Sequence, residues 1–523
     1  MLLTKMCGIL ALLNTKQKDE MCDISLQKRG PDNKVVKNIN NNTYFFNRLK
    51  IVDTEDTANQ PFVKDDTVVM CNGEIYNHKL LEQEYGLNNL DSKSDCEKIL
   101  SMYKKYKDFK KIVSLFDGVF AILLVDGDKV YFVRDGIGVR PLFYGKTDTG
   151  LAVSSIAKPL LNLVDKVIQV VPGMIYECNT NGSNMNMTEY KCNLPLMIPY
   201  PDDKVKSVRH ILYDAVKKRI DVDRNIGCLL SGGLDSSIVA SILCELMGPE
   251  NVRTYSIGMV GSTDLHYANI MAKHLGTKHT EVYFTPDEGL DAIPSVIKEL
   301  ESYDITTIRA SVPMYLLSKY IAENTSDRVI FSGEGADELF CGYLYFHNAP
   351  TPEDAAIESK RLVEDLHMYD VLRGDRCVSS NGLEFREPFL DRVLVAFALD
   401  YISADDKIPQ TKVDGEVCYE KLLLRNAFSD MLPEQILWRR KEGFSDGNSS
   451  LDKPWSNYIG DYVNNIIRDD KVEDVYLSKE QMYYKQIFDK CFTPNYCPDI
   501  YMWMPKWSGD LKDPSGRLIK IFK

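Results

Sequence analysis

A cysteine lies near the start of the chain, in the stretch Met6-Cys7-Gly8-Ile9. Were Cys7 the first residue, its free α-amine would lie beside its own thiol, as an enzyme with an N-terminal nucleophile requires. Two other interpretations are structural. Lys5 followed by the apolar run 7–13 resembles a weak signal peptide, but no small-residue cleavage site follows it. A buried β-strand is the better structural interpretation of that run.

A second stretch with chemical meaning is SGGLDSS, residues 231–237. It follows a short apolar run and precedes a helix, which the apolar spacing over 238–247 predicts and which ends at Gly248. A strand, a glycine turn and a helix N-terminus direct backbone N–H groups at one place, which suits a phosphate. No Gly-Lys-Ser/Thr follows, so this is not a Walker A loop. The stretch is similar to the pyrophosphate loop of ATP pyrophosphatases, which adenylate a carboxylate or carbonyl.

Another glycine turn follows an apolar run in VIFSGEGADELFCGY, residues 329–343. Asp337 and Glu338 stand where a helix begins, so interaction with the helix dipole is the plain explanation of these acids. Three acids around a glycine turn nevertheless suit an anionic nucleotide poorly unless a cation lies between them. Mg²⁺ is held in this way, by one or two carboxylates together with phosphate oxygens. The stretch therefore predicts a magnesium-nucleotide site.

The elements that position these residues differ between the two halves of the chain. Residues 7–190 contain short strand-like runs separated by Asp-Gly or Gly turns, which predict the hairpins of an antiparallel sheet. A proline-bearing linker near 192–204 follows. From Val205 onward, helical periodicity alternates with short buried strands, which predicts βα units and a parallel sheet. We therefore expect an α+β domain over 7–190 and an α/β domain over 205–523.

The composition excludes several classes of protein. A net charge of −13 argues against non-specific nucleic-acid binding, and no apolar run approaches the ~20 residues of a membrane span. The 13 cysteines, an odd number without a CxxC pair, indicate cytoplasmic thiols rather than a disulfide framework. The 7 histidines show no spacing typical of zinc ligands. We expect a cytoplasmic protein that binds small substrates, with no nucleic acid and no membrane, and a homodimer is left open.

Taken in order, the motifs resemble those of glutamine-dependent asparagine synthetases of the class II amidotransferase type. The N-terminal half carries MCGI, RGPD, RLKIVD, QPF, CNGEIYN, SDCEKIL and RDGIGVRPLFYG. The C-terminal half carries LLSGGLDSS, ESYDITTIRASVPMYL, SGEGADELFCGY, PFLD, RRKEGFSDG and MWMPKWSG. This resemblance covers nearly the whole chain. It implies a sandwich of antiparallel sheets flanked by helices, as in Ntn hydrolases, followed by an α/β ATP-pyrophosphatase domain with a parallel sheet.

The resemblance implies that the first domain hydrolyses glutamine. The thiol of Cys7 would attack the amide carbon, its α-amine would act as the base, and Asn72 and Gly73 would form the oxyanion hole. An α-amine with a pKa of ~7.7–8.0 is close to a thiol of ~8.5, a sensible match for proton exchange. The residues implied in glutamine binding are Arg48 for the carboxylate, Glu74 and Asp95 for the amino group, and Leu49, Lys50, Ile51, Val52, Asn72 and Gly73 around them.

For the second domain, the resemblance implies activation of aspartate by ATP. The β-carboxylate would attack the α-phosphorus, giving β-aspartyl-AMP and pyrophosphate, and ammonia arriving through an internal tunnel would displace AMP. Glu334 would assist in forming the intermediate, and Asp235 and Asp337 would lie near Mg²⁺. Thr307 and Arg309 are the candidates for the aspartate pocket. The implied ATP and pyrophosphate site consists of Leu230, Ser231, Gly232, Gly233, Asp235, Ser236, Ser237, Ile257, Ser332, Gly333 and Lys441.

The chain departs from the family's usual pattern at two positions and at its start. Ile156 replaces a glutamate near the domain junction, and Glu387 replaces a valine. Six residues precede Cys7, and an amide nitrogen on Cys7 would be no base. We therefore expect the active form to begin at Cys7.

Three other functions stay open. A β-lactam-forming synthetase shares the adenylating chemistry, although Cys7 and the C-terminal MPKW argue against it. An asparagine synthetase that uses ammonia alone is expected if Cys7 never becomes the first residue. A non-catalytic glutamine or nucleotide sensor would have lost acids such as Asp235, Glu334 and Asp337, which this chain keeps.

Overall fold

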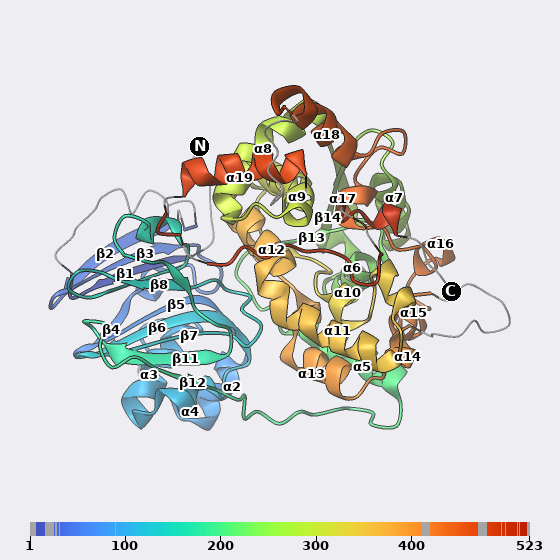
Figure 1. Ribbon diagram of the computed structural model, residues 1–523. Coiled ribbons are helices and arrows are strands. Elements are labelled where there is room, and N and C mark those ends of the chain that lie inside the picture. Colours follow the sequence, from blue (N-terminus) through green and yellow to red (C-terminus); the bar gives the residue numbers. More distant parts are fainter. Residues whose placement is uncertain are drawn as a thin grey trace.

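The computed structural model describes most of the chain, as two lobes joined by an extended segment (Figure 1). The described residues are 7–15, 26, 29–30, 32–88, 90–408, 419–468, 478–492, 494–496, 498–509, 511 and 513–519. None of the helices within these ranges combines the length and apolar character needed to cross a bilayer.

The first lobe contains two antiparallel six-stranded sheets. The first sheet, in spatial order, consists of β10 (Ile168–Gln169), β8 (Phe143–Lys146), β9 (Leu151–Ser154), β1 (Gly8–Leu13), β3 (Asn42–Arg48) and β2 (Asn33–Ile39). The second consists of β12 (Asn186–Glu189), β11 (Met174–Asn179), β7 (Lys129–Arg134), β6 (Gly118–Asp126), β5 (Thr67–Ile75) and β4 (Phe62–Lys64).

Strand β1 shows why the first sheet is buried on both faces. Its side chains alternate between the faces, as in any strand. Ile9, Ala11 and Leu13 belong to the core between the two sheets. Leu10 and Leu12 belong instead to a cluster that continues into the second lobe. This sheet therefore lies between the second sheet and the other domain.

The outer face of the second sheet is covered by helices. These are α2 (His78–Glu84), α3 (Glu97–Tyr106) and α4 (Phe109–Val113). Ile99 of α3 and Ile112 of α4 are fully buried against strand residues such as Ile122. The first lobe is thus the helix-flanked sandwich that the resemblance implied, of the Ntn type, and that prediction is confirmed.

The second lobe is built on a parallel five-stranded sheet. Its spatial order is β15 (Lys278–Tyr283), β14 (Arg253–Gly258), β13 (Asn225–Leu229), β16 (Asp327–Phe331) and β17 (Glu384–Arg386). The predicted parallel sheet is therefore confirmed.

Helices surround this sheet and extend beyond it (Figure 1). They are α5 (Lys204–Lys217), α6 (Leu234–Met247), α7 (Thr263–Leu275), α8 (Pro286–Leu300), α9 (Ile305–Asn324), α10 (Ala336–Leu339), α11 (Pro352–Asp365), α12 (Asp370–Ser379), α13 (Arg392–Asp400), α14 (Ala404–Lys407), α15 (Leu422–Ala427), α16 (Glu434–Leu437), α17 (Phe444–Gly447), α18 (Trp455–Ile466) and α19 (Lys479–Cys491). The segment between β12 and α5 contains no helix or strand.

Buried ion pairs join the two lobes. Arg29 donates from both terminal nitrogens to the carboxylate of Asp375 in α12, at 2.9 and 3.1 Å, and both side chains are almost fully buried. The carboxylate of Glu301, which follows α8, accepts the N–H groups of Ala157 and Lys158. The lobes therefore share a polar interface as well as an apolar core.

Candidate active sites

The first candidate site is a small pocket around Cys7, just before β1. The other residues that line it are Arg48, Leu49, Ile51, Val52, Ala58, Gln60, Cys71, Asn72, Gly73, Glu74, Ser94, Asp95, Cys96 and Glu384. All of them except Glu384 come from the first lobe. The pocket contains each residue predicted to bind or hydrolyse glutamine apart from Lys50, which does not line it.

The thiol of Cys7 is held by the main chain of Leu49. The N–H of Leu49 donates to Sγ at 3.3 Å, and Sγ lies 3.5 Å from the carbonyl oxygen of the same residue. Burial raises the pKa of the Cys7 thiol to about 12, although Leu49 and Arg48 act to lower it. A thiol in this environment is protonated at neutral pH, so nucleophilic attack requires a base that removes its proton.

Asn72 and Gly73 lie on β5 beside the thiol. Asn72 is 1% exposed, and its Nδ2 makes no hydrogen bond to any described residue. A buried amide donor without a partner is costly unless a ligand supplies the acceptor. Gly73 has a φ of +151°, and a Cβ there would lie 2.1 Å from the carbonyl oxygen of Val119, so only glycine fits. The pair is therefore suited to an oxyanion.

Carboxylates gather on another side of this pocket. Glu74, Asp95 and Glu384 all line it and are all buried. Desolvation, together with the charges of Glu384 and Asp95, raises the pKa of Glu74 well above its usual range. Such a concentration of acids favours a cationic ligand. Arg48 supplies positive charge, and its guanidinium donates to the carbonyl oxygen of Glu55 and to Oδ1 of Asn59.

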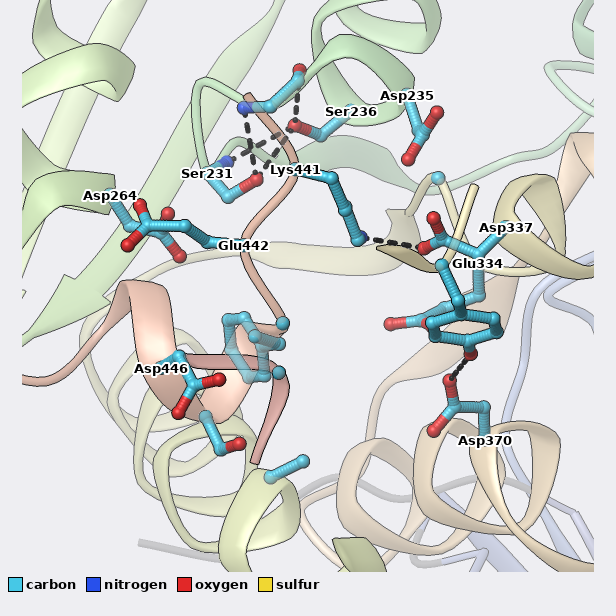
Figure 2. Close-up of a pocket in the computed structure, with 18 of the residues that line it drawn as sticks. Ser231, Asp235, Ser236, Asp264, Glu334, Asp337, Asp370, Lys441, Glu442 and Asp446 are labelled. Atoms are coloured by element: carbon cyan, nitrogen blue, oxygen red, sulfur yellow. Dashed lines mark hydrogen bonds and ion pairs between the residues drawn. The ribbon is translucent and has the colours of Figure 1, made fainter. Parts of the chain in front are cut away.

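The second candidate site is a cavity of about 450 Å³ at the carboxyl ends of the parallel strands. Ligands bind at this edge in open α/β sheets, because the loops that follow the strands meet there. Figure 2 shows Ser231, Asp235, Glu334, Asp337 and Lys441 around the cavity. A volume of this size accommodates a nucleotide.

The loop between β13 and α6 keeps its N–H groups and hydroxyls close together. Gly233 N–H donates to Oγ of Ser231, and Oγ of Ser231 and Ser236 lie 3.1 Å apart (Figure 2). Gly232 has a φ of +69°, and a Cβ there would lie 2.2 Å from the main chain of Tyr267. Glycine therefore permits the tight turn that presents the start of α6 to the cavity.

Two lysines separate the acids of the two glycine loops. Lys421 contacts the carboxylates of both Asp235 and Asp337, and Nζ of Lys441 donates to Asp337 at 2.6 Å. Burial acts to raise the pKa of Asp337, but the two lysines outweigh it and bring the pKa down to about 2. The lysines thus offset the negative charge of the two acids, which would otherwise repel a polyphosphate.

Asp235 and Asp337 could also bind a divalent cation if a bound nucleotide supplied further oxygen ligands. In the described part of the chain, no group of three or more His, Cys, Asp or Glu side chains could hold a metal. Oδ1 of Asp235 is buried and accepts no hydrogen bond from a described residue. One or two carboxylates with phosphate oxygens are the usual Mg²⁺ ligands, so the donor set suits Mg²⁺ brought in with a nucleotide.

Glu334 lies in the same cavity and is paired with Arg373 of α12. Its Oε2 lies 2.8 Å from Nη2 of Arg373, which also contacts Asp370. Burial raises the pKa of Glu334 to about 7, Arg373 opposes the rise, and Asp370 adds to it. A carboxylate that titrates near neutral pH can exchange protons during a reaction.

The cavity takes in most, but not all, of the residues predicted for the nucleotide site. Its lining includes Leu230, Ser231, Gly233, Asp235, Ser236, Ile257, Ser332, Gly333, Glu334, Asp337 and Lys441. Gly232 and Ser237 do not line it.

Thr307 and Arg309 are not among the lining residues either. Both N–H and Oγ1 of Thr307 donate to Asp304, the N-cap of α9. The guanidinium of Arg309 is bonded to Glu480 and Asp513. The structure therefore does not bring the two predicted aspartate-binding residues into the cavity.

Comparison with known proteins assigns both lobes to known families. A family model described as a glutamine amidotransferase domain matches residues 6–189, and one described as asparagine synthase matches 207–361 and 350–499. The asparagine synthetase [glutamine-hydrolyzing] of Gallus gallus is 40% identical over 567 aligned residues, with 99% of each chain covered. This chain belongs to the glutamine-hydrolysing asparagine synthetase family. The family members of Mus musculus and Homo sapiens are also 40% identical, again with 99% of each chain covered.

The similarity of this chain to solved structures is much weaker than its similarity to these relatives. Glutamine phosphoribosylpyrophosphate amidotransferase of B. subtilis is 16% identical, covers 54% of this chain and 75% of that chain, and has a TM-score of 0.28.

Several residues of the two sites in this asparagine synthetase family member were missed by sequence reasoning. Lys421, Arg373, Asp370 and Glu384 lie outside the glycine loops and the Cys7 motifs, in stretches without a chemical pattern of their own. These residues are recognised as part of the sites only because the fold places them beside acids or bases from distant segments of the chain. Glu384 lies three residues before Glu387, in GLEFREPFLD, but nothing in that stretch connects Glu384 with Cys7.

The structure describes the surroundings of Ile156 and Glu387, the two positions where we expected a departure from the family pattern. Ile156 is 7% exposed and joins the apolar core shared by the lobes, while the neighbouring N–H groups find a carboxylate in Glu301. Glu387 is 3% exposed, and its Oε1 accepts no hydrogen bond from the described residues. Burial raises the pKa of Glu387 to about 8, with Arg140 opposing the rise, so its side chain is largely neutral at pH 7.

Proposed function

We propose that this protein makes asparagine from aspartate, with ATP as the activating substrate and glutamine as the nitrogen donor. The reaction passes through β-aspartyl-AMP and releases AMP, pyrophosphate and glutamate. The observation that carries the proposal is the presence, in one chain, of a thiol pocket with an unpartnered amide donor and a cavity between two glycine loops. We further propose that it works in the cytoplasm, where its free cysteines stay reduced.

In the first pocket, the Sγ of Cys7 attacks the amide carbon of glutamine. The α-amine of Cys7 takes the thiol proton, which the high pKa of this buried thiol makes necessary. Nδ2 of Asn72 and the main chain of Gly73 stabilise the oxyanion. Ammonia leaves, and water then hydrolyses the thioester to give glutamate. Arg48 binds the carboxylate of the substrate, while Glu74 and Asp95 bind its ammonium group.

In the second cavity, the β-carboxylate of aspartate attacks the α-phosphorus of ATP. The loop 231–237 and Lys441 hold the pyrophosphate, and Ser332 and Gly333 flank the nucleotide. Asp235 and Asp337 would hold Mg²⁺, which would neutralise phosphate charge. Glu334 accepts a proton from the ammonia that attacks the acyl carbon of β-aspartyl-AMP, and AMP is the leaving group.

Product analysis tests the proposal. Purified enzyme with aspartate, ATP, Mg²⁺ and glutamine should form asparagine, AMP, pyrophosphate and glutamate in equal amounts. With ammonium chloride in place of glutamine, asparagine, AMP and pyrophosphate should still form together. Release of ADP and orthophosphate instead of AMP and pyrophosphate would exclude the adenylation mechanism.

A further inference from the structure

The glutamine pocket is completed by the other domain. Of the described residues that line it, Glu384 alone comes from the synthetase lobe, where it begins β17. This residue is 5% exposed and lies in the same pocket as Cys7, Glu74 and Asp95. A buried carboxylate next to two others is unfavourable unless positive charge accompanies it.

Arg386, two residues further along β17, supplies that charge. Its Nε donates to Oε1 of Glu384 at 2.8 Å, and its Nη2 lies 3.2 Å from Oε2 of Glu74 in the first lobe. Nη1 donates to the main-chain carbonyl of Arg219. The guanidinium is 1% exposed and therefore has little freedom to leave these partners.

The charges around Glu74 favour the binding of a further cation. One arginine lies between two glutamates, and Asp95 adds a third carboxylate to the same pocket. The three carboxylates and this one arginine carry an excess of negative charge when all are ionised. A substrate ammonium would offset that excess, and Arg386 would keep Glu74 directed toward it.

The backbone of β17 holds Arg386 in place from the other side. β17 pairs in parallel with β16, with Phe331 opposite Arg386. The N–H of Ser332, at the start of the second glycine loop, donates to the carbonyl oxygen of Arg386 at 3.0 Å. The side chain of Arg386 thus contacts Glu74 of the glutamine pocket, while its main chain is bonded to Ser332 beside the nucleotide cavity.

We propose that Arg386 and Glu384 are positioning residues of the glutamine site, in which Arg386 orients Glu74 for the substrate's ammonium group and Glu384 orients Arg386. The inference rests on the proposed glutaminase function of the Cys7 pocket. It extends that site to the synthetase domain, because neither residue belongs to the first lobe.

The test compares glutamine hydrolysis with ammonia-dependent synthesis in full-length variants. In Arg386→Met, the KM for glutamine should rise roughly 10–100-fold, because Glu74 loses the buried cation that is paired with it. The kcat of hydrolysis and the rate of asparagine formation from ammonia should each change less than about threefold, because the nucleotide cavity is untouched. Arg386→Lys, which keeps the charge but not the planar fork, should give an intermediate KM.

Two further variants make the outcome decisive. Glu384→Gln is nearly isosteric and should raise the KM for glutamine about 3–10-fold, since Arg386 loses one of its two charged partners. It decides the matter if Arg386→Met does not fold. Arg361→Met is the matched control, because Arg361 is also paired with a buried glutamate, Glu358, but outside both pockets. It should leave the KM unchanged.

An unchanged KM in Arg386→Met, or in Glu384→Gln if only that variant folds, would overturn the inference. An equal fall of the glutamine and ammonia reactions would overturn it too, because it would show a merely structural role. A different result would show that the proposed glutaminase function itself is wrong: the unsubstituted enzyme would then release no glutamate from glutamine.

Discussion

Arg29 and Asp375 form a two-point ion pair across the domain boundary, 346 residues apart in the chain and nearly sealed from solvent. A second arginine, Arg140, lies 3.5 Å from the same carboxylate. Two guanidinium groups of the glutaminase lobe therefore contact one acid of the synthetase lobe. Breaking a buried pair costs far more than breaking an exposed one, because the remaining charge stays buried.

We predict that Asp375→Asn lowers the free energy of unfolding by about 3–5 kcal/mol, since it removes a buried negative charge that contacts both Arg29 and Arg140. Denaturant unfolding followed by circular dichroism measures it. The control is Asp461→Asn, which removes an exposed pair with Lys453 and should cost less than about 1 kcal/mol. Equal, small losses in both variants would contradict the assigned importance of the buried pair.

Cys7→Ala should abolish asparagine formation from glutamine while formation from ammonia continues, because the thiol and the adenylating loop lie in different lobes. Asp235→Asn should depress synthesis from both nitrogen donors. Parallel assays of asparagine with each donor measure both effects. Persistent glutamine-dependent synthesis in Cys7→Ala would show that another residue is the nucleophile.

The α-amine of Cys7 should be free in the active enzyme. Residues 1–6 lie outside the described part of the structure, so this expectation rests on chemistry. An amide nitrogen is no base, and loss of a general base typically costs ~10²–10⁴ in rate. Intact mass spectrometry of active enzyme from its native host should show a chain that begins at Cys7. A full-length chain that hydrolyses glutamine at an undiminished rate would refute this.

Asp337→Asn should raise the Mg²⁺ concentration needed for half-maximal activity about tenfold or more, because one of the two carboxylates that face the phosphates is lost. Titration of Mg²⁺ at saturating ATP measures the change. Asp264→Asn is the matched control, since Asp264 lines the same cavity but is bonded to Arg439. Its Mg²⁺ dependence should match that of the unsubstituted enzyme, and an identical curve for Asp337→Asn would rule out the assigned role.

The pKa of about 7 for Glu334 predicts a pH dependence. A base must be ionised, so ammonia-dependent synthesis should rise with pH through about 7 and fall below it. Because ammonia also titrates, rates should be compared at constant free NH₃. Glu334→Gln should remove this limb of the profile and lower the rate ~10²-fold or more. If the rate of Glu334→Gln still rises with pH through about 7, another group is responsible for the pH dependence.

Much of this fold could be predicted because its signals are local. Alternating short strands with glycine turns and βα periodicity each depend on neighbouring residues, and so do SGGLDSS and SGEGADE. Site residues that come from distant parts of the sequence could not be predicted in this way. Lys421 contacts Asp235 across 186 residues, and Arg386 reaches Glu74 from another domain. Tertiary packing alone decides which of many lysines and arginines meets an acid, so no local pattern reveals it.

The first sheet, buried on both faces, has a consequence for how the chain is made. Its N-terminal strand β1 leaves the ribosome early, yet Leu10 and Leu12 pack in a cluster completed by helices of the second lobe. At ~5–20 residues per second, the roughly 330 residues after the first lobe take on the order of 20–70 s to synthesise. During that interval the nascent chain presents part of an apolar sheet face without its final cover. We therefore expect this apolar face to be covered only once the second lobe has been made and has docked on the first.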